Sequence, residues 1–261
     1  MYFLRWMMCA VFAACPLMAH AALYDEIQVY DDSINEPGEF GLETHINATP
    51  KGRSTPNYAG EIVPDRGARL TAEFSYGLTE VWEAGLYLPM LMDKDRNFYL
   101  AGTKLRLKWI PKKSDPEGGV FYGLNFELAK VGKQFDESTM GFELRPILGY
   151  RTKDWMFLTN PVISYPLSPG YRQGGVEFSP SIKISRNIGD GISLGTETYS
   201  DLGKLATLSA SGDQQHTIYA VIDVDRDPWK FNLGLGYGLS QLSDRWTIKA
   251  IFEIPWPFSH H

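Results

Sequence analysis

The sequence predicts an all-β protein: a closed antiparallel up-and-down transmembrane β-barrel of about twelve strands. Three observations lead to this fold class. Apolar and polar residues alternate in short segments, charged residues avoid the apolar row, and long connections alternate with short ones along most of the chain. After the leader, no stretch approaches the roughly 18 apolar residues of a transmembrane helix. A chain of this kind crosses a membrane only as a closed barrel, because lipid cannot satisfy open sheet edges.

Residues 1–21 have the features of a cleavable signal peptide. Arg5 supplies a positive start, an apolar stretch follows, and Ala19-His20-Ala21 has the small-x-small form of a signal-peptidase site. Both cysteines, Cys9 and Cys15, fall inside this leader. The mature chain therefore has no thiol for a disulfide, a nucleophile or a metal site. Export with cleavage of this peptide, and a location in the outer membrane of a Gram-negative bacterium, are predicted.

The rest of the chain divides into an acidic N-terminal lead, residues 22–38, and one barrel domain, residues 39–261. The lead is either a periplasmic tail or a segment tucked into the lumen, and we expect its charges to keep it solvated. In the barrel domain, the period of two predicts strands near residues 39–48, 68–78, 81–88, 98–110, 119–130, 140–150, 155–165, 174–187, 191–200, 215–224, 229–239 and 246–254.

The two rows of each predicted strand differ in charge. In the first strand, Phe40, Leu42 and Ile46 alternate with Glu43 and His45. Across the predicted strands the apolar row is expected to hold no Asp, Glu, Lys or Arg, although 21% of the residues are charged. A charge facing lipid costs roughly 2 to 4 kcal/mol at the bilayer midplane, whereas a lumen accepts it. The candidate lumen-lining residues are Glu43, His45, Arg69, Glu73, Lys104, Arg106, Lys108, Glu127, Glu143, Arg145, Lys183, Glu197, Lys230 and Lys249.

A soluble barrel or sandwich would also alternate, with the apolar row turned inward. Two features favour lipid outside. Trp82, Trp155 and Trp229 each open a strand after a short turn, and Trp109 closes a strand on the same side, which predicts an interfacial girdle. The alternation of long and short connections is typical of a barrel with short inner turns, long outer loops and both termini inside.

Several functional classes find little support in the sequence. A net charge of −6 argues against nucleic-acid binding, and no cofactor motif stands out. Asp223, Asp225 and Asp227 lack the glycine and glutamate of a calcium loop. Neither His45 nor His216 is followed by a serine two residues later, as a barrel hydrolase often requires, although a serine on a neighbouring strand stays possible. We assign no catalytic, cofactor or metal residue and expect a non-enzyme.

Two features of the predicted barrel stay open. The mixed charges of the inner row either fill the lumen with ion pairs or line an aqueous passage, and a passage for a small solute is preferred. Pro146, Pro161 and Pro180 fall within successive predicted strands, although proline cannot donate to a ladder. Either the predicted registers are wrong there or the wall is locally bent.

The segment Ser75-Tyr-Gly-Leu-Thr-Glu-Val-Trp-Glu-Ala-Gly-Leu-Tyr-Leu-Pro89 resembles the strand, turn and strand unit of an outer-membrane barrel family. That family is labelled putative MetA pathway of phenol degradation, and the general layout from Glu39 onward is similar. The resemblance implies a transporter-like barrel for small aromatic or other hydrophobic compounds, without established catalytic residues. Its expected partners are outer-membrane lipid, the solute, and the barrel-insertion machinery during biogenesis.

Three rival functions follow from the same residues. They are a structural barrel with a charge-filled lumen, an outer-membrane lipid hydrolase, and a soluble periplasmic carrier of lipophiles. The oligomeric state stays open.

Overall fold

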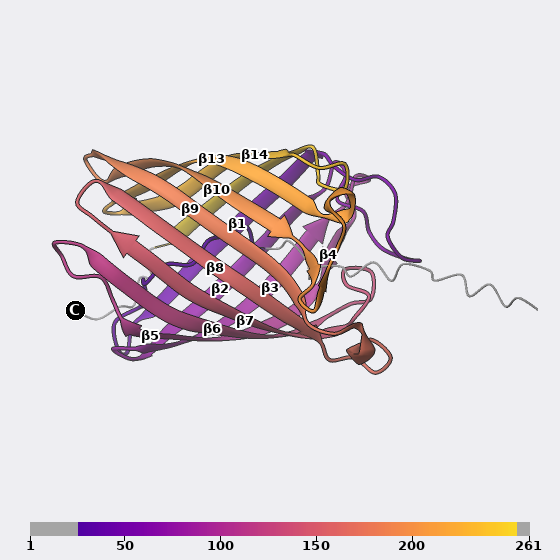
Figure 1. Ribbon diagram of the computed structural model, residues 1–261, viewed down its shortest axis with the longest axis horizontal. Helices are drawn as coiled ribbons and strands as arrows, with labels where there is room; N and C mark the ends of the chain where they lie inside the picture. The colour runs from indigo at the N-terminus through magenta and orange to yellow at the C-terminus, as the bar shows by residue number, and fades with distance from the viewer. Residues whose placement is uncertain (1–25, 255–261) are drawn as a thin grey trace, which may run out of the picture.

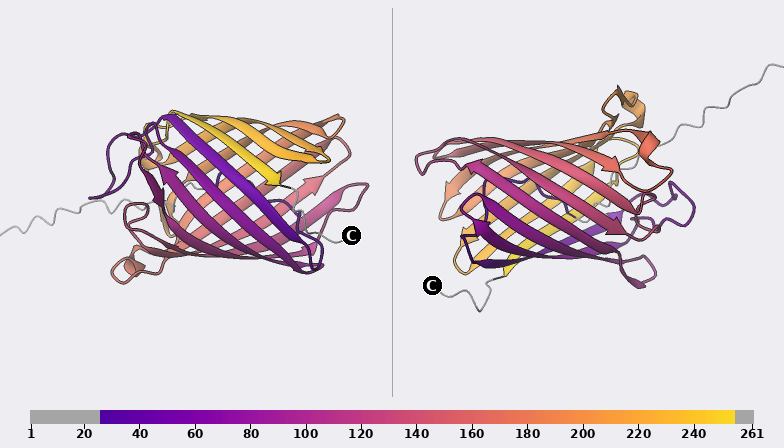
Figure 2. Two further views of the ribbon diagram at one scale, coloured as in Figure 1. Left: turned by 180° about the vertical axis from the view of Figure 1, so that it is seen from behind. Right: turned by 90° about the horizontal axis from the view of Figure 1, so that it is seen from below.

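The computed structural model describes residues 26–254, and the strands from Phe40 onward form one closed antiparallel β-barrel (Figure 1; Figure 2). The predicted signal peptide lies outside the described residues. Within this range, no helix is long and apolar enough to cross a membrane. The long strands are β1 (Phe40–Lys51), β2 (Ala68–Thr79), β3 (Trp82–Met92), β5 (Gly102–Lys112), β6 (Gly119–Val131), β7 (Met140–Arg151), β8 (Trp155–Pro166), β9 (Glu177–Gly189), β10 (Ile192–Asp201), β13 (Gln215–Arg226), β14 (Trp229–Gly238) and β15 (Trp246–Ile254).

Short elements occupy some of the connections. They are strands β4 (Phe98–Leu100), β11 (Gly203–Lys204) and β12 (Thr207–Leu208), and the 3-10 turns η1 (Arg172–Gly174) and η2 (Ser211–Asp213). The predicted strand near 98–110 is divided at Ala101, where β4 ends and β5 begins after one residue. The other predicted strands coincide with single long strands within a few residues.

Closure of the sheet comes from pairing of its first and last long strands. Each long strand pairs with the next along the chain, and β1 pairs with both β2 and β15. In the closing pair, Ile46 lies opposite Ala250 and Asn47 opposite Lys249. Every long strand thus has two neighbours, and the wall has no open edge. This arrangement confirms the predicted closed up-and-down barrel.

Alternation along the strands separates an apolar outside from a charged inside. On β5, Lys104, Arg106 and Lys108 are buried, whereas Leu105 and Leu107 are 57% and 38% exposed. A soluble barrel would show the reverse. The outer surface of this barrel is therefore the kind of surface that hydrocarbon solvates.

The expectation that the apolar row holds no charge is wrong at two positions. Lys130 on β6 and Arg186 on β9 are exposed members of the outer row. Both lie at the end of a strand, where a long cationic side chain extends to the aqueous boundary. The Arg186 guanidinium also lies over the Trp155 ring, 5.6 Å from its centroid.

The connections sort by length to the two ends of the barrel (Figure 1). Segments 52–67, 93–101, 132–139, 167–176, 202–214 and 239–245 lie at one end, and the turns at 80–81, 152–154, 190–191 and 227–228 lie at the other, together with the longer 113–118. We call these the long-loop end and the short-turn end. β1 starts and β15 finishes at the short-turn end, as an up-and-down barrel with an even number of strands requires.

The three prolines form a row across the wall. By register, Pro146 on β7 lies opposite Pro161 on β8, which pairs with Pro180 on β9. The β7–β8 ladder is interrupted between Leu144↔Ile163 and Leu148↔Thr159, and the register is the same on both sides of the gap. Two residues that face each other at a hydrogen-bonded position of an antiparallel ladder normally exchange two N–H to carbonyl bonds. Proline has no N–H, so a pair of prolines at such a position makes neither bond. The predicted registers are therefore correct, and the wall is locally unbonded rather than shifted.

Candidate functional site: the barrel lumen

The structure places the charged residues of the predicted lumen on the inner row of the barrel. Glu43, Arg69, Glu143 and Lys230 are partly buried there, and Lys230 lies near the short-turn end with its side chain 42% exposed. The remaining members, His45, Glu73, Lys104, Arg106, Lys108, Glu127, Arg145, Lys183, Glu197 and Lys249, are buried. So many charges are buried together because they lie beside opposite charges and beside a further segment of the chain.

That segment is the N-terminal lead, whose expected solvation is wrong. From Glu26 the lead lies inside the lumen, and Ile27, Val29 and Tyr30 are 3 to 6% exposed. The side chain of Asn160 on β8 binds the Tyr30 backbone twice. Its Oδ1 accepts from the Tyr30 N–H at 2.7 Å, and its Nδ2 donates to the Tyr30 carbonyl at 3.0 Å. One amide side chain therefore takes the place of a neighbouring strand.

Cations of the inner row satisfy other carbonyls of the lead. Lys108 Nζ donates to Ser33 O at 2.6 Å, Lys249 Nζ to Ile27 O at 2.9 Å, and Arg145 Nη1 to Gln28 O at 3.2 Å. A lone extended segment inside a barrel has no strand partner, and its buried carbonyls require donors from the wall. The wall supplies them from β5, β7 and β15, so the lead is attached around the lumen.

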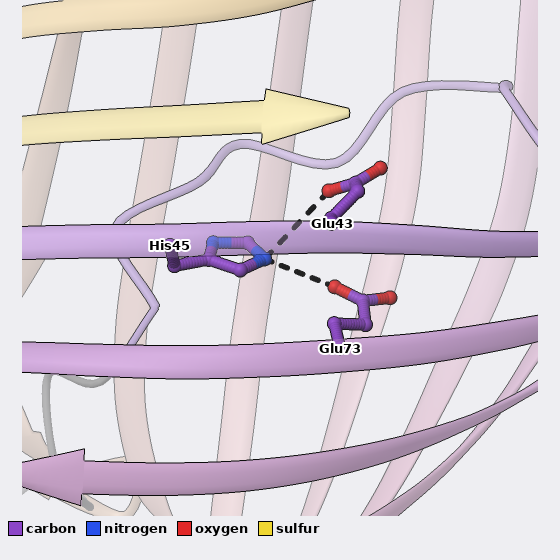
Figure 3. A group of neighbouring side chains, drawn as sticks. All are labelled: Glu43, His45 and Glu73. Atoms are coloured by element: carbon purple, nitrogen blue, oxygen red, sulfur yellow. Dashed lines mark hydrogen bonds and ion pairs between the residues drawn. The ribbon is translucent and has the colours of Figure 1, made fainter. Parts of the chain in front are cut away.

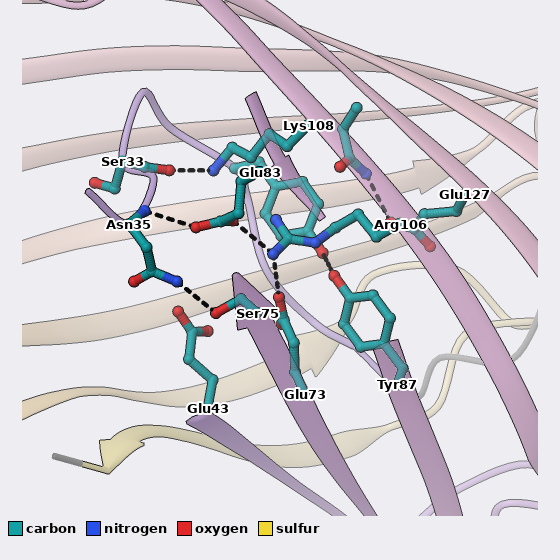
Figure 4. Close-up of polar contacts among 12 residues, drawn as sticks. Ser33, Asn35, Glu43, Glu73, Ser75, Glu83, Tyr87, Arg106, Lys108 and Glu127 are labelled. Atoms are coloured by element: carbon teal, nitrogen blue, oxygen red, sulfur yellow. Dashed lines mark hydrogen bonds and ion pairs between the residues drawn. The ribbon is translucent and has the colours of Figure 1, made fainter. Parts of the chain in front are cut away.

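An ion cluster on β2, β3 and β5 lies beside the lead (Figure 4). Arg106 Nη2 is 2.7 Å from Glu73 Oε1 and 2.7 Å from Glu83 Oε1. The other oxygen of Glu83 accepts from the backbone N–H of Asn35 in the lead at 2.6 Å. The Tyr30 and Tyr87 hydroxyls are hydrogen-bonded at 2.8 Å. We call Glu73, Glu83, Tyr87 and Arg106 the central cluster.

A second ion cluster lies on β9, β10, β13 and β15. Glu197 contacts both Lys249 and Lys183, the latter at 3.2 Å, and Lys183 also reaches Asp223 at 2.8 Å. The Tyr199 hydroxyl donates to Glu197 at 2.6 Å. Side chains on opposite parts of the wall are thus linked through ion pairs and through the lead.

Among residues 26–254, two spaces along the lumen have lining residues that do not overlap. The larger, about 580 Å³, is lined by residues 28–31 and 33–35 of the lead, by residues 152–156 at the turn and the start of β8, and by members of both ion clusters. The smaller, about 180 Å³, is lined by residues toward the long-loop end, including Asp136, Tyr165 and Tyr171. Burial raises the pKa of the Asp136 carboxyl to about 6. Residues of the lead and of the central cluster line the larger space, and none of them lines the smaller one.

Glu43, His45 and Glu73 form the group among residues 26–254 whose ligand atoms are close enough to hold a metal ion (Figure 3). His45 Nε2 is 3.0 Å from Glu73 Oε2 and 3.6 Å from Glu43 Oε2, and its ring is fully buried. Arg106 already supplies a positive charge to the other oxygen of Glu73. A hydrogen bond between the imidazole and the Glu73 carboxylate explains this geometry as well as a metal does.

The tryptophans of the predicted girdle lie at the short-turn end. Trp82 pairs with Trp109 across β3 and β5, with ring centroids 5.7 Å apart. Trp155 opens β8 and Trp229 opens β14, and both are exposed. The four residues thus share one end of the barrel. Their role as an interfacial girdle stays a prediction.

The structure brings a serine to one of the two histidines considered from the sequence. Ser200 Oγ on β10 lies 2.9 Å from His216 Nδ1 on β13. Sequence spacing missed this pair because the residues meet across neighbouring strands. Spacing also missed Asn160 and the lead, although Ile27 and Val29 already alternate in the lead as in a buried strand.

No family model matches the sequence, and no curated protein matches it. In fold, the chain is similar to an outer-membrane channel from Pseudomonas putida F1, with a TM-score of 0.58, 10% identity, and coverage of 88% of this chain and 100% of that one. It is also similar to the NanC porin, with a TM-score of 0.50, 10% identity, and coverage of 83% and 100%.

At this level of identity the similarity concerns the fold alone. The chain has the β-barrel fold of outer-membrane channels and porins. The family that the segment 75–89 resembles is not confirmed by any of these matches.

Proposed function

We propose that this protein is an outer-membrane channel for small solutes, in which the N-terminal lead closes or narrows the passage. The observation that carries the proposal is that one closed barrel holds two cavities with separate linings, and that residues of the lead and of the central cluster line the larger one. A solute passes between the cavities when the lead moves. The lead is held by hydrogen bonds to wall side chains and is not a strand of the wall, so its displacement leaves the barrel ladder intact.

The lining of the smaller cavity supports a small aromatic or otherwise hydrophobic solute, with a preference for a positive charge. Tyr171 of the 167–176 connection supplies aromatic surface. The ionisable lining residues are Glu127, Asp136, Glu137, Glu143 and Glu177 on the acidic side, and Lys104 and Lys204 on the basic side. Acidic groups beside an aromatic ring favour an organic ammonium over a carboxylate of equal size.

Deletion of residues 26–34 tests the channel. We expect purified wild-type protein in planar bilayers to conduct weakly, and the deletion variant to conduct several-fold more, because the lead no longer separates the cavities. Heat-modifiable migration on electrophoresis verifies that both proteins are folded barrels. An unchanged conductance after deletion would show that the lead is not the barrier.

Solute preference is measured on the same preparations. Entry of benzylammonium into liposomes is expected to exceed entry of benzoate. Equal rates would remove the cavity charge as the selecting feature.

The ion pairs that cross the lumen favour one other function, a structural barrel with a filled interior. Glu197 contacts Lys183 and Lys249 from other strands, and Arg106 bridges Glu73 and Glu83. In that case neither the wild-type protein nor the deletion variant conducts.

A further inference from the structure

We propose that Ser200, His216 and Gln214 form an acyl-ester hydrolase site on the outer surface of the barrel, near the long-loop end. Ser200 and His216 lie directly opposite each other on β10 and β13. The adjacent residues in the chain, Tyr199 and Thr217, belong to the inner row. Because successive side chains of a strand point to opposite faces, Ser200 and His216 both belong to the outer row. The site is therefore separate from the lumen.

The hydrogen bonds determine which imidazole nitrogen carries the proton. Gln214 Nε2 donates to Ser209 O at 2.8 Å, so Gln214 Oε1 is the atom that faces His216 Nε2 at 3.1 Å. An amide oxygen only accepts, and His216 Nε2 must therefore be the protonated nitrogen of the neutral ring. Nδ1 is left with a lone pair, 2.9 Å from Ser200 Oγ.

This arrangement has the three parts that activate a serine nucleophile: a hydroxyl, a base within hydrogen-bond reach, and a third group that orients the base. Ser243 holds the backbone of the same histidine. Its Oγ accepts from His216 N and donates to His216 O, each at 2.9 Å. Backbone and ring are both restrained, so the base is held toward Ser200.

The surroundings suit the acyl chain of a membrane lipid. Ile218 follows His216 on the outer row and is 37% exposed. Leu239, which is 61% exposed, donates its N–H to the His216 carbonyl. Leu208, beside the Ser209 carbonyl that holds Gln214, is 50% exposed. An ester at the lipid headgroup boundary would place its acyl chain along these residues and its carbonyl near Ser200.

The reaction uses water as its co-reactant. Ser200 Oγ attacks the ester carbonyl as its proton moves to His216 Nδ1, and the tetrahedral intermediate expels the alcohol, which takes that proton. Water then attacks the acyl-serine and gives a proton to His216. Release of the fatty acid returns that proton to Ser200 Oγ.

Labelling with a fluorophosphonate tests the nucleophile, because an activated serine displaces fluoride and stays covalently modified. We expect wild-type protein in detergent to be labelled with one probe per chain. Ser200→Ala is expected to abolish labelling, and His216→Gln to slow it at least 100-fold. Thr198→Ala is the matched control, since it removes the next outer-row hydroxyl of β10, which has no part in the proposed site, and its labelling is expected to stay within a few-fold of wild type.

Release of fatty acid from phosphatidylethanolamine vesicles is the second measurement, and it should follow the same order of variants. The proposal is overturned if folded wild-type barrels are not labelled, or if Ser200→Ala is labelled as fast as wild type. These readouts do not depend on conductance, so failure of the hydrolase and failure of the channel are distinguishable.

Discussion

Removal of the Lys249 ammonium tests whether the ion pairs inside the lumen stabilise the fold. Lys249 is fully buried, donates to Ile27 O, and contacts Glu197, whose side chain is 1% exposed. Breaking a buried pair by removing one partner costs about 3 to 5 kcal/mol, because the remaining charge is uncompensated. Lys183 stays 3.2 Å from Glu197. We therefore expect Lys249→Met to lower the free energy of unfolding by about 3 kcal/mol, the lower end of that range.

The assay is urea-induced unfolding in lipid vesicles, followed by tryptophan fluorescence. Lys230→Met is the matched control, because Lys230 lies 3.7 Å from both Asp225 and Glu253 with its side chain 42% exposed. Exposed pairs contribute up to about 1 kcal/mol. The double variant Lys249→Met/Glu197→Gln should lose less than the sum of its single variants, because the two side chains are coupled. Equal losses for Lys249→Met and Lys230→Met would refute the reasoning.

Three further predictions concern the lead, the wall and a loop. Asn160→Leu removes both hydrogen bonds to the Tyr30 backbone. Each backbone group left unsatisfied costs about 1 to 3 kcal/mol of stability, so the lead should become cleavable by added protease. Continued resistance to the protease would contradict this. Pro161→Ala restores one ladder donor and should raise the free energy of unfolding by about 1 kcal/mol; a loss would show that the gap is favourable. Burial raises the pKa of Asp136 from 3.8 to about 6, so the folded state holds this proton more tightly and stability falls as pH rises through that window. Asp136→Asn should gain stability over wild type across the same window, and a pH-independent difference would contradict the assignment.

Much of this barrel is determined locally by the sequence. Successive side chains of any strand point to opposite faces, so the period of two places Arg106 inside and Leu105 outside. This result does not depend on which strands lie beside β5. The strand positions, the inner and outer rows and the sorting of long and short connections follow from the same local pattern and from turn length. Lys130 and Arg186 depart from the pattern near strand ends. At the membrane boundary a charged side chain on the outer row costs little free energy, so the pattern is not enforced there.

The tertiary structure decided which residues meet. Asn160 binds Tyr30 across 130 positions, and Lys249 binds the Ile27 carbonyl across 222 positions. Ser200 reaches His216 through strand pairing. No periodicity encodes such contacts, because they depend on closure of the sheet and on the space that remains inside it. The acidic composition of the lead indicated a solvated segment, yet the donors that hold it belong to strands that surround it after the barrel has closed.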